Sequence, residues 1–98
     1  MGKYIVTVMT KPKDGKDEEF RNWYKHIHIP ELLKLPGFIS GNRYYSVKAE
    51  LPYMAIYEIE TEDIQKTMDC FQNNSPNLTW SNALDMDSIQ SQVYEVLE

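Results

Sequence analysis

The residues best able to do chemistry lie together in one stretch, residues 20–38, FRNWYKHIHIPELLKLPGF. It holds both histidines of the chain and one of its two tryptophans. Because an unperturbed imidazole titrates near pH ~6.5, a histidine beside an aromatic wall can take up or release a proton near neutral pH. His28 borders the aromatic residues of this stretch and is the candidate acid or base. His26 lies on the other flank and is interpreted as a solvated residue.

Two plainer interpretations of His28 stand beside the catalytic one. The first is a helix-end residue whose ring hydrogen-bonds the last carbonyls of the helix and orders the turn at Pro30. The second is a metal site shared with His26 and Glu31. It is disfavoured because residues two apart do not share a helix face and because zinc usually has three or more protein ligands. We therefore expect no metal site.

Sequence motifs for the common cofactors are missing. There is no Gly-rich phosphate loop, no CxxC, no HExxH and no GxSxG. Nucleotide binding, dithiol redox chemistry, zinc proteolysis and serine hydrolysis therefore lack support. Cys70 has no histidine near it in sequence and is interpreted as inert. The sequence predicts a protein without a cofactor.

The stretch that carries the histidines begins as an amphipathic helix. Pro30 disfavours the α conformation at the residue before it, so we expect the helix to end near His28 and a short helical turn to follow over residues 31–35. Such an end would leave the His28 ring partly exposed, and we expect the ring to face the cleft between helix and sheet rather than open solvent. Asp14 or Asp17 is expected to cap the start. The predicted buried face has the spacing i, i+3, i+4 and i+7: Phe20, Trp23, Tyr24 and Ile27.

The other helices and strands are predicted from the spacing of apolar residues and from the residues that favour turns and helix caps. A second helix is expected to follow Thr61, its predicted N-cap, and to end over residues 73–76. One or two further helical turns, anchored by Trp80, are predicted over residues 78–84. β-branched and aromatic residues with a period of two predict strands over residues 4–10, 38–47, 53–60 and 89–97.

Two glycines are expected to have backbone roles. Gly37 follows a proline in the turn before the second predicted strand, where we expect a positive φ. Gly41 lies inside that strand and is expected to mark either a bulge or a close approach of another group to the backbone.

The predicted order is β-α-β-β-α-β in a single domain, residues 1–98. Two helices that join strands in this order indicate an α+β, ferredoxin-like fold, a four-stranded antiparallel sheet with both helices on one face. The first strand is apolar on both faces, with Ile5 and Met9 on one and Val6 and Val8 on the other. Because two helices cover one face only, we expect a homodimer that packs the uncovered sheet faces together.

The composition of the chain indicates which classes of binding partner and which cellular compartment to expect. The chain has a net charge of −5 and scattered basic residues, so no nucleic-acid-binding patch is indicated. No apolar run approaches the ~20 residues of a membrane-spanning helix, and the N-terminus has no signal-peptide pattern. The single cysteine cannot form an internal disulfide. These features favour a cytoplasmic protein that binds neither nucleic acid nor membrane.

Several short motifs carry a family resemblance. They are Trp23-Tyr24, His28-Ile29-Pro30-Glu31, Leu35-Pro36-Gly37-Phe38 and Arg43-Tyr44. In these residues and in the order of its elements, the chain resembles the EthD-like group of the dimeric α/β-barrel superfamily. The resemblance implies a dimer with a pocket between helices and sheet in each subunit, and His28 as the motif histidine. Lys25 and His26 stand where relatives often carry acidic residues, and the Asn, Trp and His set of the haem-degrading branch is not evident.

Two functions are open on these grounds. The first is a small cofactor-independent enzyme that acts on an aromatic or polyketide-like molecule by proton transfer, as a cyclase, isomerase or oxygenase. His28 would be its acid or base, and Arg43 and Tyr44 would orient the substrate or stabilise an oxyanion. The second is a non-catalytic dimeric module that binds a small apolar or aromatic ligand or serves as an accessory partner, since a fold does not decide a function. In both, the predicted ligand-binding walls are Trp23, Tyr24, Tyr57 and Trp80.

Overall fold

A computed structural model describes residues 2–98. The strands, in chain order, are β1 (Gly2–Thr10), β2 (Phe38–Tyr45), β3 (Tyr53–Thr61) and β4 (Gln90–Glu95). The helices are α1 (Asp17–Trp23), η1 (Tyr24–His28), α2 (Ile29–Leu32) and α3 (Ile64–Asn74). Two short 3₁₀ turns follow, η2 (Ser75–Asn77) and η3 (Met86–Ser88).

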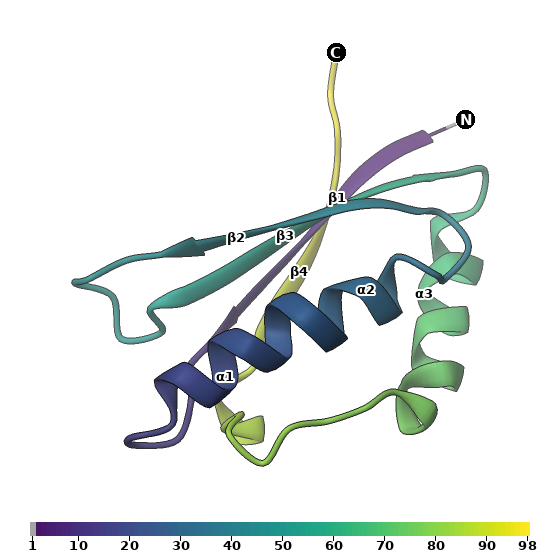
Figure 1. Cartoon of the computed structure of the whole chain (residues 1–98). Helices are drawn as coiled ribbons and strands as arrows, with labels where there is room; N and C mark the ends of the chain where they lie inside the picture. The colour runs from purple at the N-terminus through teal and green to yellow at the C-terminus, as the bar shows by residue number, and fades with distance from the viewer. Residues whose placement is uncertain (1) are drawn as a thin grey trace.

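The strands form one antiparallel sheet in the order β2-β3-β1-β4. α1, η1 and α2 join end to end as one long helix, and this helix and α3 lie on the same side of the sheet (Figure 1). The segment after α3 runs back beneath α1 to reach β4 (Figure 1). This is the ferredoxin-like arrangement that the sequence predicts. Within residues 2–98, no helix is long and apolar enough to cross a membrane.

Alternation along the central strands divides the sheet into two faces. Ala55 and Tyr57 of β3 are buried against the helices, and they pair with Val8 and Val6 of β1 on the same face. Ile56 lies between them, points to the opposite face and is only half-buried. The core of the monomer therefore lies between the helices and one face of the sheet.

One π-helical turn, η1, interrupts the long helix. The backbone N–H of Ile29 donates to the carbonyl of Tyr24, whereas an α-helix would use the residue one position later. The helix then continues through Ile29 and Pro30 to Leu32, so the predicted end near His28 is wrong. We attribute the continuation to the wider turn, which moves the Pro30 ring away from the carbonyl that it would meet in an α-helix.

The extra residue in the π turn changes which side chains face the sheet. Ile27, predicted on the buried face, is 39% exposed. His28 faces the cleft between helix and sheet, as predicted, but it is only 6% exposed and so is buried more deeply than expected. The three aromatic residues of the predicted face remain buried because they precede the shift. After it, His28 and Leu32 continue the buried face one turn apart. The π turn therefore decides that the imidazole, and not Ile27, enters the interior.

The starts of two helices differ from the predictions because side-chain hydrogen bonds compete for the capping residues. α1 begins at Asp17 without either predicted cap, and the Asp17 carboxylate instead accepts from the Tyr53 hydroxyl (3.0 Å). α3 is capped by Asp63, which accepts from the backbone N–H of Lys66 (3.1 Å). Thr61, the predicted cap, ends β3, and its hydroxyl accepts from the N–H of Asp63 (3.2 Å).

Residues 78–84 form no helix, contrary to the prediction. Leu78 is extended, with φ −77° and ψ 159°, and farther along the N–H of Leu84 closes a turn onto the carbonyl of Ser81 (3.3 Å). Hydrogen bonds to the long helix, described below, hold this segment and outweigh its local helical preference.

Gly37 and Gly41 lie where a side chain would meet packed neighbours. Gly37 has φ +90°, and an added Cβ would lie 3.2 Å from Thr67 Cγ2 and 3.3 Å from the carbonyl oxygen of Glu60. The predicted positive φ is therefore confirmed. At Gly41 an added Cβ would lie 3.0 Å from the Tyr57 ring, so this glycine permits a close approach, and the bulge lies earlier in β2.

We expect Gly37→Ala to lower the free energy of unfolding by about 1 kcal/mol or more, because alanine there combines a left-handed backbone with two tight contacts. Denaturant unfolding measures the change. Gly15→Ala is the matched control, since Gly15 also has a positive φ (+76°) but an added Cβ meets nothing within 4 Å. Equal losses in the two variants would show that the packing around Gly37 adds no cost.

Candidate functional site

A cavity of about 380 Å³ lies between the helices and the sheet. Its volume falls within the roughly 300–1,000 Å³ of small-molecule sites. It is bounded by the long helix, by α3, by the sheet and by residues 75–89, the segment that runs from α3 to β4. Most of the lining is apolar, as in Val6, Val8, Leu32, Phe38, Met68, Phe71 and Leu84.

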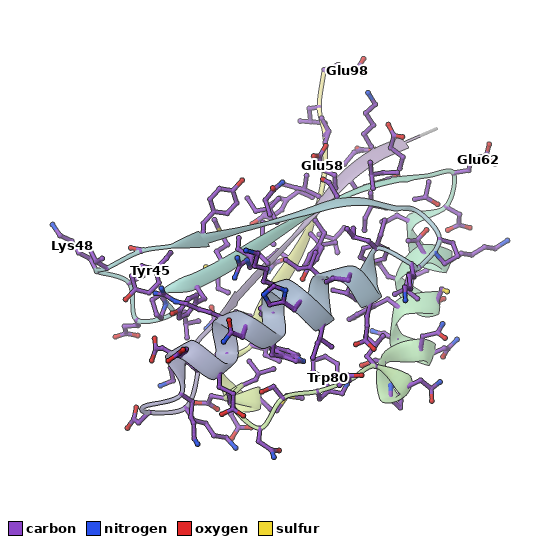
Figure 2. The ribbon with its side chains drawn as sticks, in the orientation of Figure 1. Tyr45, Lys48, Glu58, Glu62, Trp80 and Glu98 are labelled. Atoms are coloured by element: carbon purple, nitrogen blue, oxygen red, sulfur yellow. The ribbon has the colours of Figure 1, made fainter. Side chains whose placement is uncertain are left out.

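The cavity brings together His28 and all four residues predicted to form the walls of a ligand site. Three come from the long helix, one from β3 and one from residues 75–89, so no local spacing in the sequence joins them. Figure 2 shows Trp80 on the segment that runs beneath the helix. The five are Trp23, Tyr24, His28, Tyr57 and Trp80.

Two indoles and one imidazole form a continuous aromatic wall. The Trp23 and His28 rings are stacked, with centroids 4.6 Å apart and planes at 24°, and the Trp80 centroid lies 5.2 Å from that of His28. Trp23 Nε1 donates to the carbonyl of Thr79 (2.7 Å) and Trp80 Nε1 to that of Ser75 (2.8 Å). Because these N–H groups are already paired, the indoles offer the cavity their apolar surfaces.

His28 is the buried polar group that lacks a partner. Its Nδ1 is enclosed and has no hydrogen bond to any group of residues 2–98. Burial disfavours the imidazolium and lowers the pKa of His28 to about 4, against a smaller opposing effect of the Glu31 carboxylate. His28 is therefore neutral near pH ~7. An unpaired buried polar atom costs about 1–3 kcal/mol, a cost that a hydrogen-bonding ligand could remove.

Two phenols supply the second polar feature of the cavity. The Tyr57 hydroxyl donates to the Tyr24 hydroxyl at 3.3 Å, and the Tyr24 ring meets His28 edge-on with centroids 4.9 Å apart. Burial raises the pKa of both phenols, so both keep their protons at neutral pH. Tyr57 uses its proton in this bond, which leaves the Tyr24 O–H able to donate to a ligand oxygen.

Arg43 and Tyr44 lie outside the cavity. The Arg43 guanidinium donates to the carbonyl of Arg21 (3.3 Å) and lines a separate small hollow beside Tyr24. Tyr44 is 50% exposed on the face of the sheet away from the helices. Neighbours on a strand point to opposite faces, so the two side chains could not converge on one site. The structure gives neither residue a place beside His28.

Residues 75–89 contribute more than the sequence indicates. Glu31 Oε1 accepts from the N–H of Thr79 (2.8 Å) and Glu31 Oε2 from its hydroxyl (2.9 Å), which ties this segment to α2. The sequence indicates Glu31 as a disfavoured metal ligand and as the last residue of the motif that begins at His28. Within residues 2–98 no group of three potential metal-binding side chains is found. The spacing of His28 and Glu31 hints at proximity, but no sequence signal connects Glu31 to Thr79.

The residues that line the cavity therefore supply apolar walls, one neutral imidazole and a pair of hydrogen-bonded phenols. These features suit a small, largely apolar molecule that carries an oxygen-bearing group at one edge. A hydroxyl or an acidic C–H on such a molecule could meet the imidazole, and a carbonyl or enol oxygen could accept from Tyr24.

No family model and no curated protein matches the chain. Solved structures do match it. A heme-degrading protein, MhuD from Mycobacterium tuberculosis, solved with two hemes bound in its active site, has a TM-score of 0.70 at 14% identity, over 97% of this chain and 96% of that one. An EthD-family protein from Bacillus halodurans C-125 has a TM-score of 0.62 at 15% identity, over 99% and 100% of the two chains.

A conserved protein from Methanosarcina mazei Go1 has a TM-score of 0.63 at 26% identity, over 96% of this chain and 92% of that one. At 14% and 15% identity, the likeness to the heme-degrading and EthD-family proteins shows the fold alone. The resemblance predicted from the sequence is confirmed at the level of the fold: this chain has a ferredoxin-like fold, which it shares with an EthD-family protein.

Proposed function

We propose that this chain is a small enzyme whose cavity binds an aromatic or polyketide-like molecule, and that His28 takes a proton from an acidic C–H or O–H of that molecule. The observation that carries the proposal is the unpaired Nδ1 of His28, buried beside an apolar cavity. A buried polar atom without a partner is unusual, and a role completed by a ligand would account for it.

The proposed step needs only groups of this chain and the substrate. The substrate C–H or O–H bond breaks, its proton goes to His28, and its electron pair delocalises onto a substrate oxygen. The Tyr24 O–H, which Tyr57 holds, would donate to that oxygen and stabilise the negative charge. The anion would in turn stabilise the imidazolium, so His28 would hold a proton more tightly in the complex than in the free protein.

A second candidate function is a non-catalytic module that binds the same kind of molecule. Two observations favour it. Burial makes His28 a weak base, with a pKa of about 4, and no carboxylate within residues 2–98 hydrogen-bonds the ring to orient or strengthen it. In this function the neutral imidazole and the Tyr24 O–H only recognise the polar edge of the ligand.

Turnover by the first mechanism requires neutral His28. Among aromatic and polyketide-like phenols and ketones that raise the melting temperature, we expect at least one to be converted. His28→Asn should lower kcat about 100-fold or more, because asparagine can hydrogen-bond but cannot carry the proton. The wild-type kcat/KM should fall as pH drops through about 4, the pKa of His28 in the free protein.

His26→Asn is the matched control, since the His26 ring is exposed. Binding without conversion in the wild type would favour the module.

Burial of neutral His28 should also be measurable without any substrate. The pKa is lowered from 6.5 to about 4, so between these values the unfolded chain binds a proton that the folded chain does not. Stability is therefore full above pH ~6.5 and decreases as pH falls to about 4, by about 3 kcal/mol in total. Denaturant unfolding over this pH range should show that the free energy of unfolding depends less steeply on pH in His28→Asn than in His26→Asn. Identical slopes would place His28 in water.

The face of the sheet away from the helices supports the proposal of a homodimer. Met9 of β1 pairs with Met54 of β3, and Ile5 and Ile56 lie on the same face of these strands. All four of these apolar side chains are only half-buried in the monomer. Tyr44 extends the same face and is exposed. A second copy of the sheet, packed face to face, would cover it.

We expect the wild type to have the mass of a dimer at micromolar concentration in light scattering. Ile56→Lys should shift it to a monomer, because two buried ammonium groups near the interface would be unpaired. Ile27→Lys is the matched control, since Ile27 lies on the exposed side of the long helix. A monomeric wild type would contradict the proposal.

A further inference from the structure

The cavity is closed on one side by a strap, residues 75–89, that has little regular structure of its own. Its side chains Trp80, Leu84 and Met86 line the cavity. Within residues 2–98, no strand of the sheet pairs with its middle, so its position depends on the burial of Ala83 and Leu84 and on a few separate hydrogen bonds. Figure 2 shows Trp80 on the strap beneath the long helix.

The end of the strap that leads into β4 is fixed to the start of the chain. The N–H of Lys13 donates to the carbonyl of Ala83 (2.7 Å), and the N–H of Asp85 donates to the carbonyl of Lys11 (3.2 Å). Ser88 adds a side-chain contact to Lys11, because its hydroxyl accepts from the Lys11 N–H (3.1 Å). These bonds lie beyond Trp80 and do not hold it directly.

The end nearer α3 is fixed through a single residue, Thr79. Its N–H and hydroxyl both donate to the Glu31 carboxylate, at 2.8 and 2.9 Å, and its carbonyl accepts from Trp23 Nε1 at 2.7 Å. All the polar groups of Thr79 are thus paired with the long helix. The two bonds to Glu31 are charge-assisted, which makes them stronger than bonds between neutral groups.

We propose that Glu31 is a positioning residue. Together with Thr79 it forms a latch that holds the strap closed, keeps Trp80 and Trp23 against His28, and sets how fast a ligand enters and leaves the cavity. Glu31 touches no reacting atom in this arrangement. The inference extends the proposed function, because the latch acts on the same cavity, but its geometry does not depend on any chemistry there.

Glu31 lies one helical turn after His28, so its carboxylate also affects the imidazole through space. That charge raises the proton affinity of His28 and opposes the effect of burial. The two effects can be separated by mutation. Glu31→Gln removes the charge and weakens the latch, whereas Thr79→Val removes only the hydroxyl bond and leaves the charge in place.

Two measurements test the latch. The first is amide hydrogen exchange over residues 78–82, which needs no ligand. The second is the dissociation rate of 1-naphthol, followed by the fluorescence of the protein's two tryptophans, both of which line the cavity. Thr79→Ser keeps the hydroxyl, and Glu62→Gln removes an exposed carboxylate that lies apart from Trp80 (Figure 2). These two variants are the controls.

We expect exchange and dissociation to be roughly tenfold faster in Glu31→Gln and several-fold faster in Thr79→Val, with both controls like the wild type. Unchanged exchange in both latch variants would overturn the proposal, and so would faster exchange with unchanged dissociation. If Glu31→Gln fails to fold, Thr79→Val decides by the same criteria. If the wild type does not bind 1-naphthol, that result counts against the proposed function, and the exchange data alone decide whether the latch exists.

Discussion

The site depends on the hydrogen bond from the Ile29 N–H to the Tyr24 carbonyl, which defines the π turn. A regular α-helix through the same residues would turn Ile27 inward and leave the imidazole at the border of the buried face. The extra residue places His28 in line with Leu32, stacks it on Trp23 and lets the helix continue past Pro30. π turns are uncommon and are often found at functional sites, and here the turn is the direct reason that a titratable group lies beside the cavity.

The aromatic wall and the strap stabilise each other. Trp23 is buried and Trp80 is half-buried, and an indole N–H in such a place needs an acceptor. Both acceptors are carbonyls of the strap, at Thr79 and Ser75. In turn, the strap has no ladder of backbone hydrogen bonds and is held at Thr79 by Glu31. Removal of either partner of one of these hydrogen bonds would leave a polar group unpaired. The arrangement of the wall therefore depends on both the long helix and the strap, which are distant in sequence.

Electrostatics sets the kind of molecule that the cavity can accept. The side chains that line it carry no charge near pH ~7, because the lining includes no Asp, Glu, Lys or Arg, His28 is neutral and both phenols keep their protons. The protein as a whole has a net charge of −5. A permanently anionic ligand would meet neither a cation in the cavity nor an attractive field outside it. An uncharged or weakly acidic molecule fits better, because it can lose its proton to the imidazole only after it has bound.

The sequence alone determined the order of the elements, the ferredoxin-like fold, the positive φ at Gly37 and the aromatic residues near His28. These follow from period, turn chemistry and composition, which act over a few neighbouring residues. It indicated that the His28 ring faces the cleft between helix and sheet, but it did not determine how deeply the ring is buried, because Pro30 predicts a helix end and only packing against the sheet favours the π turn that avoids it. Nor did the sequence show that Arg43 and Tyr44 lie outside the cavity, or that Glu31 hydrogen-bonds Thr79. Those outcomes depend on strand register and on contacts between distant segments, and such contacts exist only once the chain has folded.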